Sequence, residues 1–532
     1  MILASGLAYL FPASPLIILG AFLAGVLAIT WIGGDEIGLA STAYSLIVIG
    51  VFFHAVVDAT SLTLFAAIAA VACIFARVTR RTGNAADPSP ILGPGVGTAV
   101  AALPFALGLP LLVVVIYTDL SNAVMTHYAM PSLLQPLIAL LAFAVWWYRD
   151  RFRPSEAALH PVVILLGIYC VVLLAGTIWA VELELADARL GESVKALLIC
   201  ILAGSLAASW SALRRGIAAL VIAATCFSVL SVIQVLTGKL TNVLGGLIHL
   251  QSGNIYSDVS LPRASGPPVA DPNFYARILL VGVPLAIAFA IAERRPRWCI
   301  AYILAACAVT AGTLLTYSRG AMLTVAGMAI LLLFAWPLRP RYAAFAAITA
   351  ALLLAVLPSD ITRRVFTLQT LLPGQEEALE LDSSVEERKL LVRAGMGMFA
   401  DHPIGGVGPA NFEAHFNQYA DRAGSAAYDY HPPGTRKFPH GLWVEIASES
   451  GLLGLTAFGS ILIAAFVALW RARRELLARN DAPHAALATG LAIALAGYLG
   501  ASLFLHETHL RYIGLYLGLT VAVTRLTREA TA

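Results

Sequence analysis

Long apolar stretches separated by short polar ones recur along almost the whole chain. An apolar run of about 17–25 residues is long enough to cross the hydrocarbon core of a bilayer as an α-helix. The runs do not alternate between apolar and polar residues, as VVILLGIYCVVLLAGTIWA illustrates, so they do not fit the strands of a membrane barrel. The pattern predicts an all-α polytopic integral membrane protein.

The runs predict about 12–15 transmembrane helices. The candidate spans lie near residues 14–32, 39–57, 60–76, 96–117, 131–148, 160–181, 196–212, 216–235, 277–293, 298–316, 320–336, 342–357, 452–470, 484–505 and 510–526. Composition agrees, because 59% of the 532 residues are hydrophobic and 12% are charged, whereas soluble domains carry roughly 25% charged residues. A soluble protein is therefore excluded.

Basic residues are sorted into every second polar loop. Lys and Arg gather in the cytoplasmic loops of membrane proteins, so we expect these loops and the C-terminus to be cytoplasmic. The opposite, periplasmic face then receives an acidic loop at 182–194 and two longer polar segments at 236–276 and 358–451. The sorted arginines are Arg77, Arg80, Arg81, Arg149, Arg151, Arg153, Arg214, Arg215, Arg294, Arg295, Arg297, Arg339, Arg341, Arg471, Arg473, Arg474, Arg525 and Arg528.

This sorting divides the chain into three expected parts. Residues 1–357 form transmembrane helices and include the periplasmic loop 236–276, residues 358–451 form a large periplasmic loop subdomain, and residues 452–532 form the C-terminal transmembrane helices.

Within the large loop, apolar residues at helical intervals predict an amphipathic helix over 385–400, which can lie on the membrane surface. The run HPIGGVGPANF breaks this helix with Pro403 and its glycines. A second helical pattern follows, in which Phe412, Phe416 and Tyr419 share one face. We therefore expect two short helices joined by a tight turn.

Two arginines of the outer face are candidates for chemistry. Arg319 lies in LLTYSRGAMLTVAG between two apolar runs, where an ionisable group lines a cavity, pairs with a charge or serves as an interfacial anchor. Arg263 lies in LPRASGPPVADPNFYARILL, where the alternative is an exposed loop arginine. In the same stretch, Asp271 is expected to cap a helix that begins with Pro272.

Four histidines, His402, His415, His431 and His440, lie in the large loop, and HETH follows at 506–509. The loop spacings match no known zinc motif, and interfacial histidines explain HETH more simply, so we expect no metal. His440 differs because it follows a proline-rich loop and immediately precedes the helix that re-enters the membrane. A neutral imidazole there can take a proton from a sugar hydroxyl as it attacks.

Together, two arginines and one histidine on the outer face suggest recognition of a phosphorylated lipid beside a general base. Arginine suits a pyrophosphate because its planar donors make bidentate contacts and remain charged. No DxD-like acidic pair occurs in the outer loops, which disfavours a metal-bridged diphosphate. The arginines would then neutralise the leaving group in place of a metal.

Three segments resemble the O-antigen ligases and the related bacterial polysaccharide polymerases. They are RASGPPVADPNF at 263–274, YSRGA at 317–321, and HPIGGVGPANF followed by PHGLWVEIASESGLLGL within 402–455. Their order, their expected side of the membrane and the large loop before the histidine match the family, whereas the N-terminal 235 residues look like generic membrane helices.

The resemblance implies a GT-C-like, metal-independent, inverting glycosyltransferase of the bacterial inner membrane that needs no cofactor and binds no nucleic acid. Its partners would be an undecaprenyl-pyrophosphate-linked glycan, an acceptor glycolipid or glycan, and the lipid bilayer. Arg263 and Arg319 would hold the pyrophosphate, and His440 would activate or place the acceptor. The expected substrate-binding residues are Arg263, Arg319, Asn273, Arg277 and Glu445. The family commonly has an asparagine after the histidine, where this chain has Gly441, so the contact of that side chain is unassigned.

Two acceptors remain open: lipid A-core for a ligase, which we favour, and another lipid-linked repeat for an O-antigen or exopolysaccharide polymerase. A transporter of a lipid-linked or anionic substrate is the alternative from another class. It needs charges at mid-helix depth, and the predicted helices have almost none apart from Asp58. A membrane scaffold would leave the arginines and the segment 358–451 without a role.

Overall fold

The computed structural model describes residues 96–122, 125, 131–237, 249–256, 259–267, 271–336, 383–423, 437–506 and 510–529. Within these residues, five helices are long and apolar enough to cross a membrane, and four shorter apolar helices accompany them. The protein is thus an all-α polytopic membrane protein, which confirms the fold class predicted from the hydrophobic pattern. The candidate spans at 14–32, 39–57, 60–76 and 342–357 lie outside the described residues.

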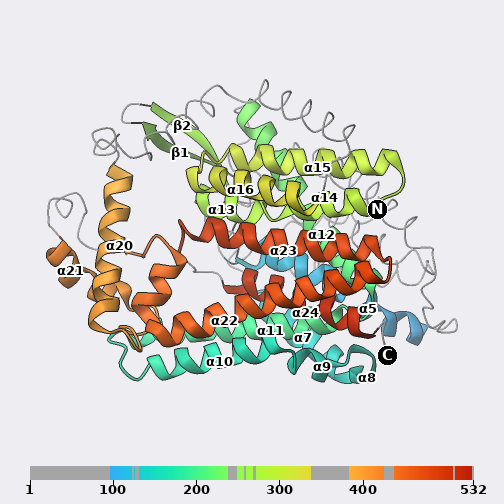
Figure 1. Ribbon diagram of the computed structural model, residues 1–532, viewed down its shortest axis with the longest axis horizontal. Coiled ribbons are helices and arrows are strands. Elements are labelled where there is room, and N and C mark those ends of the chain that lie inside the picture. Colours follow the sequence, from blue (N-terminus) through green and yellow to red (C-terminus); the bar gives the residue numbers. More distant parts are fainter. Residues whose placement is uncertain are drawn as a thin grey trace, which may run out of the picture.

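The following helices pack side by side in one bundle (Figure 1). They are α5 Val96–Tyr117, α7 Leu134–Trp147, α10 Pro161–Gly176, α11 Leu183–Leu206, α12 Trp210–Thr237, α13 Pro272–Leu279, α14 Gly282–Ala292, α15 Pro296–Leu314, α16 Arg319–Ala335, α22 Leu442–Ala478, α23 Ala482–Ser502 and α24 Leu510–Glu529. Two short helices, α8 Arg149–Phe152 and α9 Pro154–Ala158, lie at one end of the bundle.

Helix α24 lies inside the bundle, with nearly all its side chains buried. Its glycines allow close packing against α11, because a Cβ on Gly514 would lie 2.5 Å from the Ala196 carbonyl oxygen and one on Gly518 would lie 2.7 Å from that of Cys200. Small residues at helix interfaces bring backbones together where lipid supplies no hydrophobic drive between helices. This contact fixes α24 against its neighbour.

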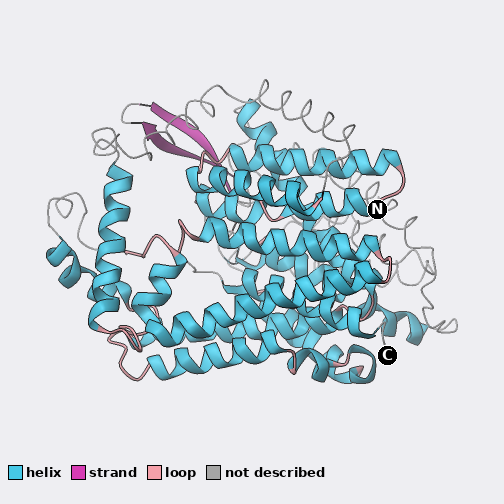
Figure 2. Ribbon diagram, viewed as in Figure 1, coloured by secondary structure: helices cyan, strands magenta, loops and turns pink. Residues whose placement is uncertain are grey.

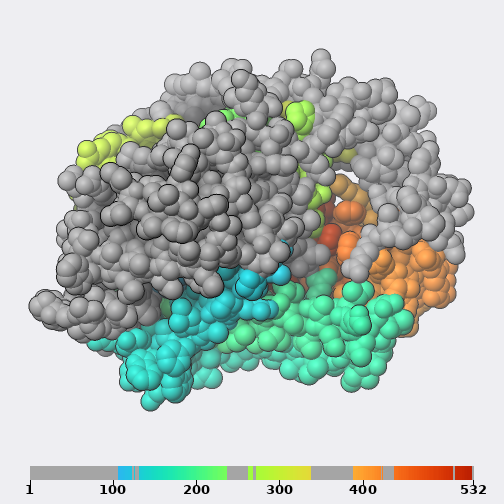
Figure 3. Space-filling model, turned by 180° about the vertical axis from the view of Figure 1, so that it is seen from behind, coloured from blue at the N-terminus to red at the C-terminus, as the bar shows by residue number. Residues whose placement is uncertain are grey.

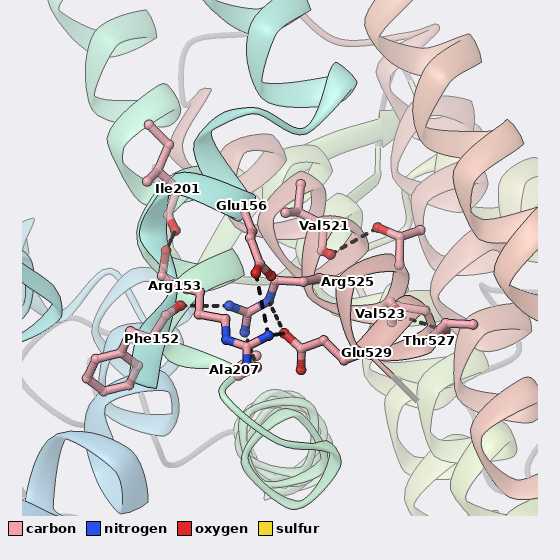
Figure 4. Close-up of polar contacts among 12 residues, drawn as sticks. Phe152, Arg153, Glu156, Ile201, Ala207, Val521, Val523, Arg525, Thr527 and Glu529 are labelled. Carbon is pink, nitrogen blue, oxygen red and sulfur yellow. Dashed lines mark hydrogen bonds and ion pairs between the residues drawn. The ribbon is translucent and has the colours of Figure 1, made fainter. Parts of the chain in front are cut away.

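Several of the arginine-bearing segments lie at one end of the bundle, which we call the basic end. Arg525 is 5% exposed, and its guanidinium donates to the carbonyls of Phe152 at 2.6 Å and Ala207 at 2.7 Å, which satisfies the last carbonyls of two helices (Figure 4). Arg153 also pairs with Glu529 at 3.7 Å. The loops after α14 and α22 lie at this end too (Figure 1). The side of the membrane that the basic end faces stays a prediction.

The prediction of an acidic loop at 182–194 is wrong, because these residues form the first turns of α11. Ala186, Ser193 and Ala196 are buried on one face of that helix, whereas Glu184 and Asp187 are exposed. A helix that continues beyond the apolar core can carry charges on its solvated face, so acidic residues alone do not indicate a loop.

The span predicted at 196–212 is not one continuous helix, since α11 ends at Leu206 and α12 begins at Trp210.

The opposite end, called the site end, carries the remaining elements (Figure 2). Strands β1 His249–Tyr256 and β2 Val259–Ser265 form an antiparallel hairpin that the sequence did not predict. Helix α20 Ser383–Asp401 runs across the end of the bundle, and α21 Phe412–Ala423 follows it.

The helix pair predicted in the large loop is confirmed. Leu391 and Met398 of α20 share a small separate core with Phe412, Phe416 and Tyr419 of α21. On the opposite side of α20, the apolar residues Val392 and Met396 are 37% and 47% exposed. That this helix lies on a membrane surface, and that the chain divides at 357 and 451, stay predictions.

Candidate functional site

Three arginines from separate segments border one cavity of about 120 Å³ at the site end. Arg263 comes from β2, Arg319 from the start of α16, and Arg388 from α20. This arginine cavity is lined by Arg263, Asn273, Tyr317, Ser318, Arg319, Gly320, Ala321, Arg388, Ala501, Phe504 and Leu505. Arg263 and Arg319, which the sequence analysis placed at one pyrophosphate site, thus border one cavity together with a third arginine.

Arg263 is half-buried and oriented by neutral groups. Its Nε donates to the Thr316 carbonyl at 2.8 Å, and Nη2 donates to Asn273 Oδ1 at 3.3 Å. Strand β2 is fixed beside it, because the Ala264 amide donates to the Leu315 carbonyl at 3.0 Å. The guanidinium is therefore held in one orientation by the turn that precedes α16.

The arginines also act on one another electrostatically. Burial lowers the pKa of Arg263, and the charges of Arg388 and Arg319 lower it further, while Asp271 raises it. Arginine stays protonated despite such shifts, so like charges accumulate at the cavity. A bound anion would relieve their repulsion.

The start of α16 adds a further positive element. Tyr317 has a positive φ of 53°, which turns the chain into the helix, and the Ser318 side chain caps it by accepting from the Ala321 amide at 3.4 Å. The first turn of this 17-residue helix lines the cavity. Helix N-termini stabilise anions through their unpaired N–H groups and the helix dipole.

Asn273 lies in the first turn of α13 and contributes to the cavity. The predicted cap is confirmed, since Asp271 Oδ1 accepts from the amides of Asn273 at 2.7 Å and Phe274 at 3.3 Å, and Pro272 begins the helix. The cap explains Asp271 structurally and leaves the Asn273 side chain beside Arg263.

His440 lies just before α22 and is half-buried. It is not among the residues that line the arginine cavity. Its ring centroid lies 6.0 Å from that of His506, which stacks on Phe438 at 4.6 Å. The turn that carries His506 also carries Phe504 and Leu505 of the cavity. His440 and the arginine cavity therefore border the same turn.

Glu445 and Arg277, predicted as substrate-binding, do not line the cavity. Glu445 is 3% exposed and forms an ion pair with Arg189 of α11. Arg277 is 1% exposed and donates to Ser502 Oγ and to the His506 carbonyl, both at 3.2 Å. Both residues are thus engaged in contacts between segments of the protein.

The motif segments HPIGGVGPANF and PHGLWVEIASESGLLGL pack directly on one another. Helix α22 breaks at Gly451, which has a φ of +60°. The amides of Leu452 and Leu453 then donate to the Pro403 and Ile404 carbonyls at 2.8 and 3.1 Å. The two segments form one unit whose hydrogen bonds replace those that the helix loses at its break.

Close contacts hold the two segments of this unit together. Gly406 has a φ of +67°, and a Cβ there would lie 2.3 Å from the Glu449 carbonyl carbon. The Glu449 carboxylate accepts from the Ala410 amide at 2.8 Å. Asn411, fully buried, accepts from the Glu182 amide at 2.7 Å. The turn thus ties α20 to α22 and to the start of α11, and from behind the orange and green segments meet at this end (Figure 3).

Arg388 was not predicted from the sequence as a site residue. It lies in the charged run EERK, where an arginine that lines a cavity looks like one on a solvated helix face. The helical period of α20 offered one signal, because Arg388 stands one turn before Val392, but a period does not reveal what faces the helix. His506 was noticed in HETH, without its contact to His440.

Among the described residues, no three His, Cys, Asp or Glu side chains are grouped to hold a metal ion. His431 and His509 lie outside the described residues.

Comparison with known proteins identifies the segment that carries much of this site. The O-antigen ligase family model matches residues 300–459, a range that contains Arg319, Arg388 and His440. No curated protein matches the chain. Residues 300–459 therefore carry an O-antigen ligase family domain, which confirms over this range the family resemblance seen in the sequence.

Proposed function

We propose that this protein is a membrane glycosyltransferase that transfers a glycan from undecaprenyl pyrophosphate to the hydroxyl of an acceptor sugar. The acceptor is lipid A-core, so the protein acts as an O-antigen ligase in lipopolysaccharide assembly. The observation that carries the proposal is the convergence of Arg263, Arg319 and Arg388 on one cavity, two of them within the family-matched segment. The protein lies in the inner membrane, with the site end periplasmic and the C-terminus cytoplasmic.

The arginine cavity suits the diphosphate of such a donor. A lipid-linked diphosphate carries its negative charges on neighbouring phosphates, and planar guanidinium groups bind phosphate oxygens in bidentate pairs. The N-terminus of α16 supplies further donors. These groups stabilise the negative charge that develops on the leaving diphosphate, so the reaction proceeds without a metal ion or cofactor.

His440 acts as the general base. As the acceptor oxygen attacks the anomeric carbon, its proton passes to the imidazole, the new carbon–oxygen bond forms, and the bond to the diphosphate oxygen breaks with its electron pair going to the diphosphate. Attack from the face opposite the leaving group inverts the anomeric configuration. This role is supported by the position of His440 beside the same turn that lines the arginine cavity.

Transfer by purified protein in detergent tests the proposal. The donor is an undecaprenyl-pyrophosphate glycan, the acceptor is lipid A-core or a second lipid-linked glycan, and transfer is measured both without and with a chelator. His440→Ala should abolish transfer, whereas His402→Ala, which alters an exposed histidine at the same end, should not.

The acceptor decides the class of enzyme. Product on lipid A-core supports a ligase, while product only on the second lipid-linked glycan would make the protein a polymerase. No product on either acceptor would contradict the transferase and favour a transporter of the lipid-linked substrate. Loss of product on adding chelator would contradict the metal-independent mechanism.

A further inference from the structure

The turn 502–506 borders both the arginine cavity and His440. Phe504 and Leu505 line the cavity, and Phe504 packs against the start of α16, where a Cβ on Gly320 would lie 2.7 Å from its ring. His506 meets the ring of His440 edge to face, at 6.0 Å and 73°. A shift of this turn would therefore move both sides of the site.

Arg277 fixes this turn from within the protein. One guanidinium nitrogen, Nη1, donates to Ser502 Oγ at the start of the turn and to the His506 carbonyl at its end, both at 3.2 Å. The group lies between two rings, 4.9 Å from the centroids of both Phe274 and Tyr498. Arg277 thus holds the two ends of the turn together while staying out of the cavity.

The same helix, α13, reaches both halves of the site. Asn273 lines the cavity and accepts from Arg263. The next residue, Phe274, meets the edge of the His506 ring at 5.0 Å and 80°. With Arg277 near its end, this short helix contacts the donor side, the base side and the turn between them.

We propose that Arg277 is a positioning residue that sets His440 relative to the arginine cavity, and hence the base relative to the leaving diphosphate. This inference rests on the proposed function. A buried arginine is costly unless its donors are satisfied, and a smaller polar side chain could hydrogen-bond one end of the turn. The planar guanidinium of arginine makes both hydrogen bonds through one nitrogen and also contacts the rings of Phe274 and Tyr498.

Steady-state kinetics of transfer test this role. Arg277→Gln should lower kcat by roughly 100-fold, because misplacing a catalytic group by about 1 Å has an effect of that size, while the KM for the donor stays unchanged. Ser502→Ala, which removes one acceptor of the guanidinium, should lower kcat less. Arg277→Lys should recover part of the loss, since its ammonium can still reach one end of the turn.

Arg525→Gln is the matched control. Arg525 is also buried and also donates to two segments, at 2.6 and 2.7 Å, but at the basic end. Its variant should lose thermal stability, like Arg277→Gln, and keep its kcat per folded molecule. Both variants are compared at equal folded fraction, measured by size-exclusion chromatography and thermal melting.

Each outcome separates the possibilities. Equal loss of kcat in the Arg277 and Arg525 variants, with Ser502→Ala unaffected, would mean that Arg277 is merely structural. A raised donor KM with unchanged kcat in Arg277→Gln would instead make Arg277 a substrate-binding residue, as the sequence suggested. If the wild-type protein gave no product with either acceptor, the proposed function itself would fall, and the inference with it.

Discussion

Arg263 and Arg388 border the same cavity, although one belongs to the β-hairpin and the other to the helix that crosses the end of the bundle. Their charges act on one another, because Arg388 lowers the pKa of Arg263. A bound anion would relieve the repulsion between these like charges. The pair therefore links the large loop to the arginine cavity.

Arg388→Ala should weaken donor binding by roughly 10-fold to 100-fold, the value of a hydrogen bond to a charged group at about 1.5–3 kcal/mol. The effect should appear as a higher donor KM in the transfer assay. Arg393→Ala is the control, because Arg393 lies on the exposed side of the same helix and does not line the cavity. Equal effects of the two substitutions would mean that Arg388 acts only through the net charge of α20.

Arg319→Lys should impair transfer although the charge is kept. Lysine presents a compact ammonium that cannot make the paired contacts of a guanidinium with phosphate oxygens. Initial rates at saturating donor measure the effect. Retention of full activity in this variant would show that a point charge suffices and would contradict bidentate binding of phosphate by Arg319.

Glu445 should prove structural rather than substrate-binding. Arg189→Met removes the cation that interacts with the buried carboxylates of Glu445 and Glu449, and it should cost about 3–5 kcal/mol of stability. The double variant Arg189→Met with Glu445→Leu should recover most of that stability and keep the donor KM. Thermal melting in detergent and the transfer assay together test this. A double variant that is stable and has a raised donor KM would return Glu445 to substrate binding.

Gly406→Ala should destabilise the contact between the turn 402–411 and α22. The residue has a φ of +67°, and an added Cβ would lie 2.3 Å from the Glu449 carbonyl carbon. The backbone conformation alone costs about 1–2 kcal/mol for a residue with a side chain. Gly459→Ala in α22 is the control, since a Cβ there meets nothing within 4 Å. Equal melting temperatures for both variants would contradict the packing described.

Much of the fold follows from the hydrophobic pattern, because a helix that crosses lipid must be apolar over its whole length. The two helices of the large loop followed from their period, and the cap of α13 from Asp271 and Pro272. The first turns of α11 were missed because Glu184 and Asp187 lie on its exposed face. The β-hairpin was missed because prediction of this loop rested on its polarity alone.

The sequence grouped Arg263, Arg319 and His440 in one candidate site, but it did not indicate Arg388. Arg263 and Arg319 stood out by their placement, and the structure brings them to one cavity. Arg277 was grouped with them because it is near Asn273 in the sequence, yet it points into the protein and reaches Ser502. Such long-range contacts depend on how helices pack, which the local pattern of one helix does not specify.

Measuring the binding of the lipid diphosphate tests directly whether the arginine cavity is a diphosphate site. The affinity of purified protein for undecaprenyl pyrophosphate and for undecaprenyl monophosphate is measured in detergent, for the wild type, Arg263→Ala, Arg388→Ala and the control Arg393→Ala. We expect that the wild type and Arg393→Ala prefer the diphosphate and that both cavity variants lose this preference. Equal affinity for the two lipids in the wild type, or an unchanged preference in both cavity variants, would contradict a diphosphate site at the arginine cavity.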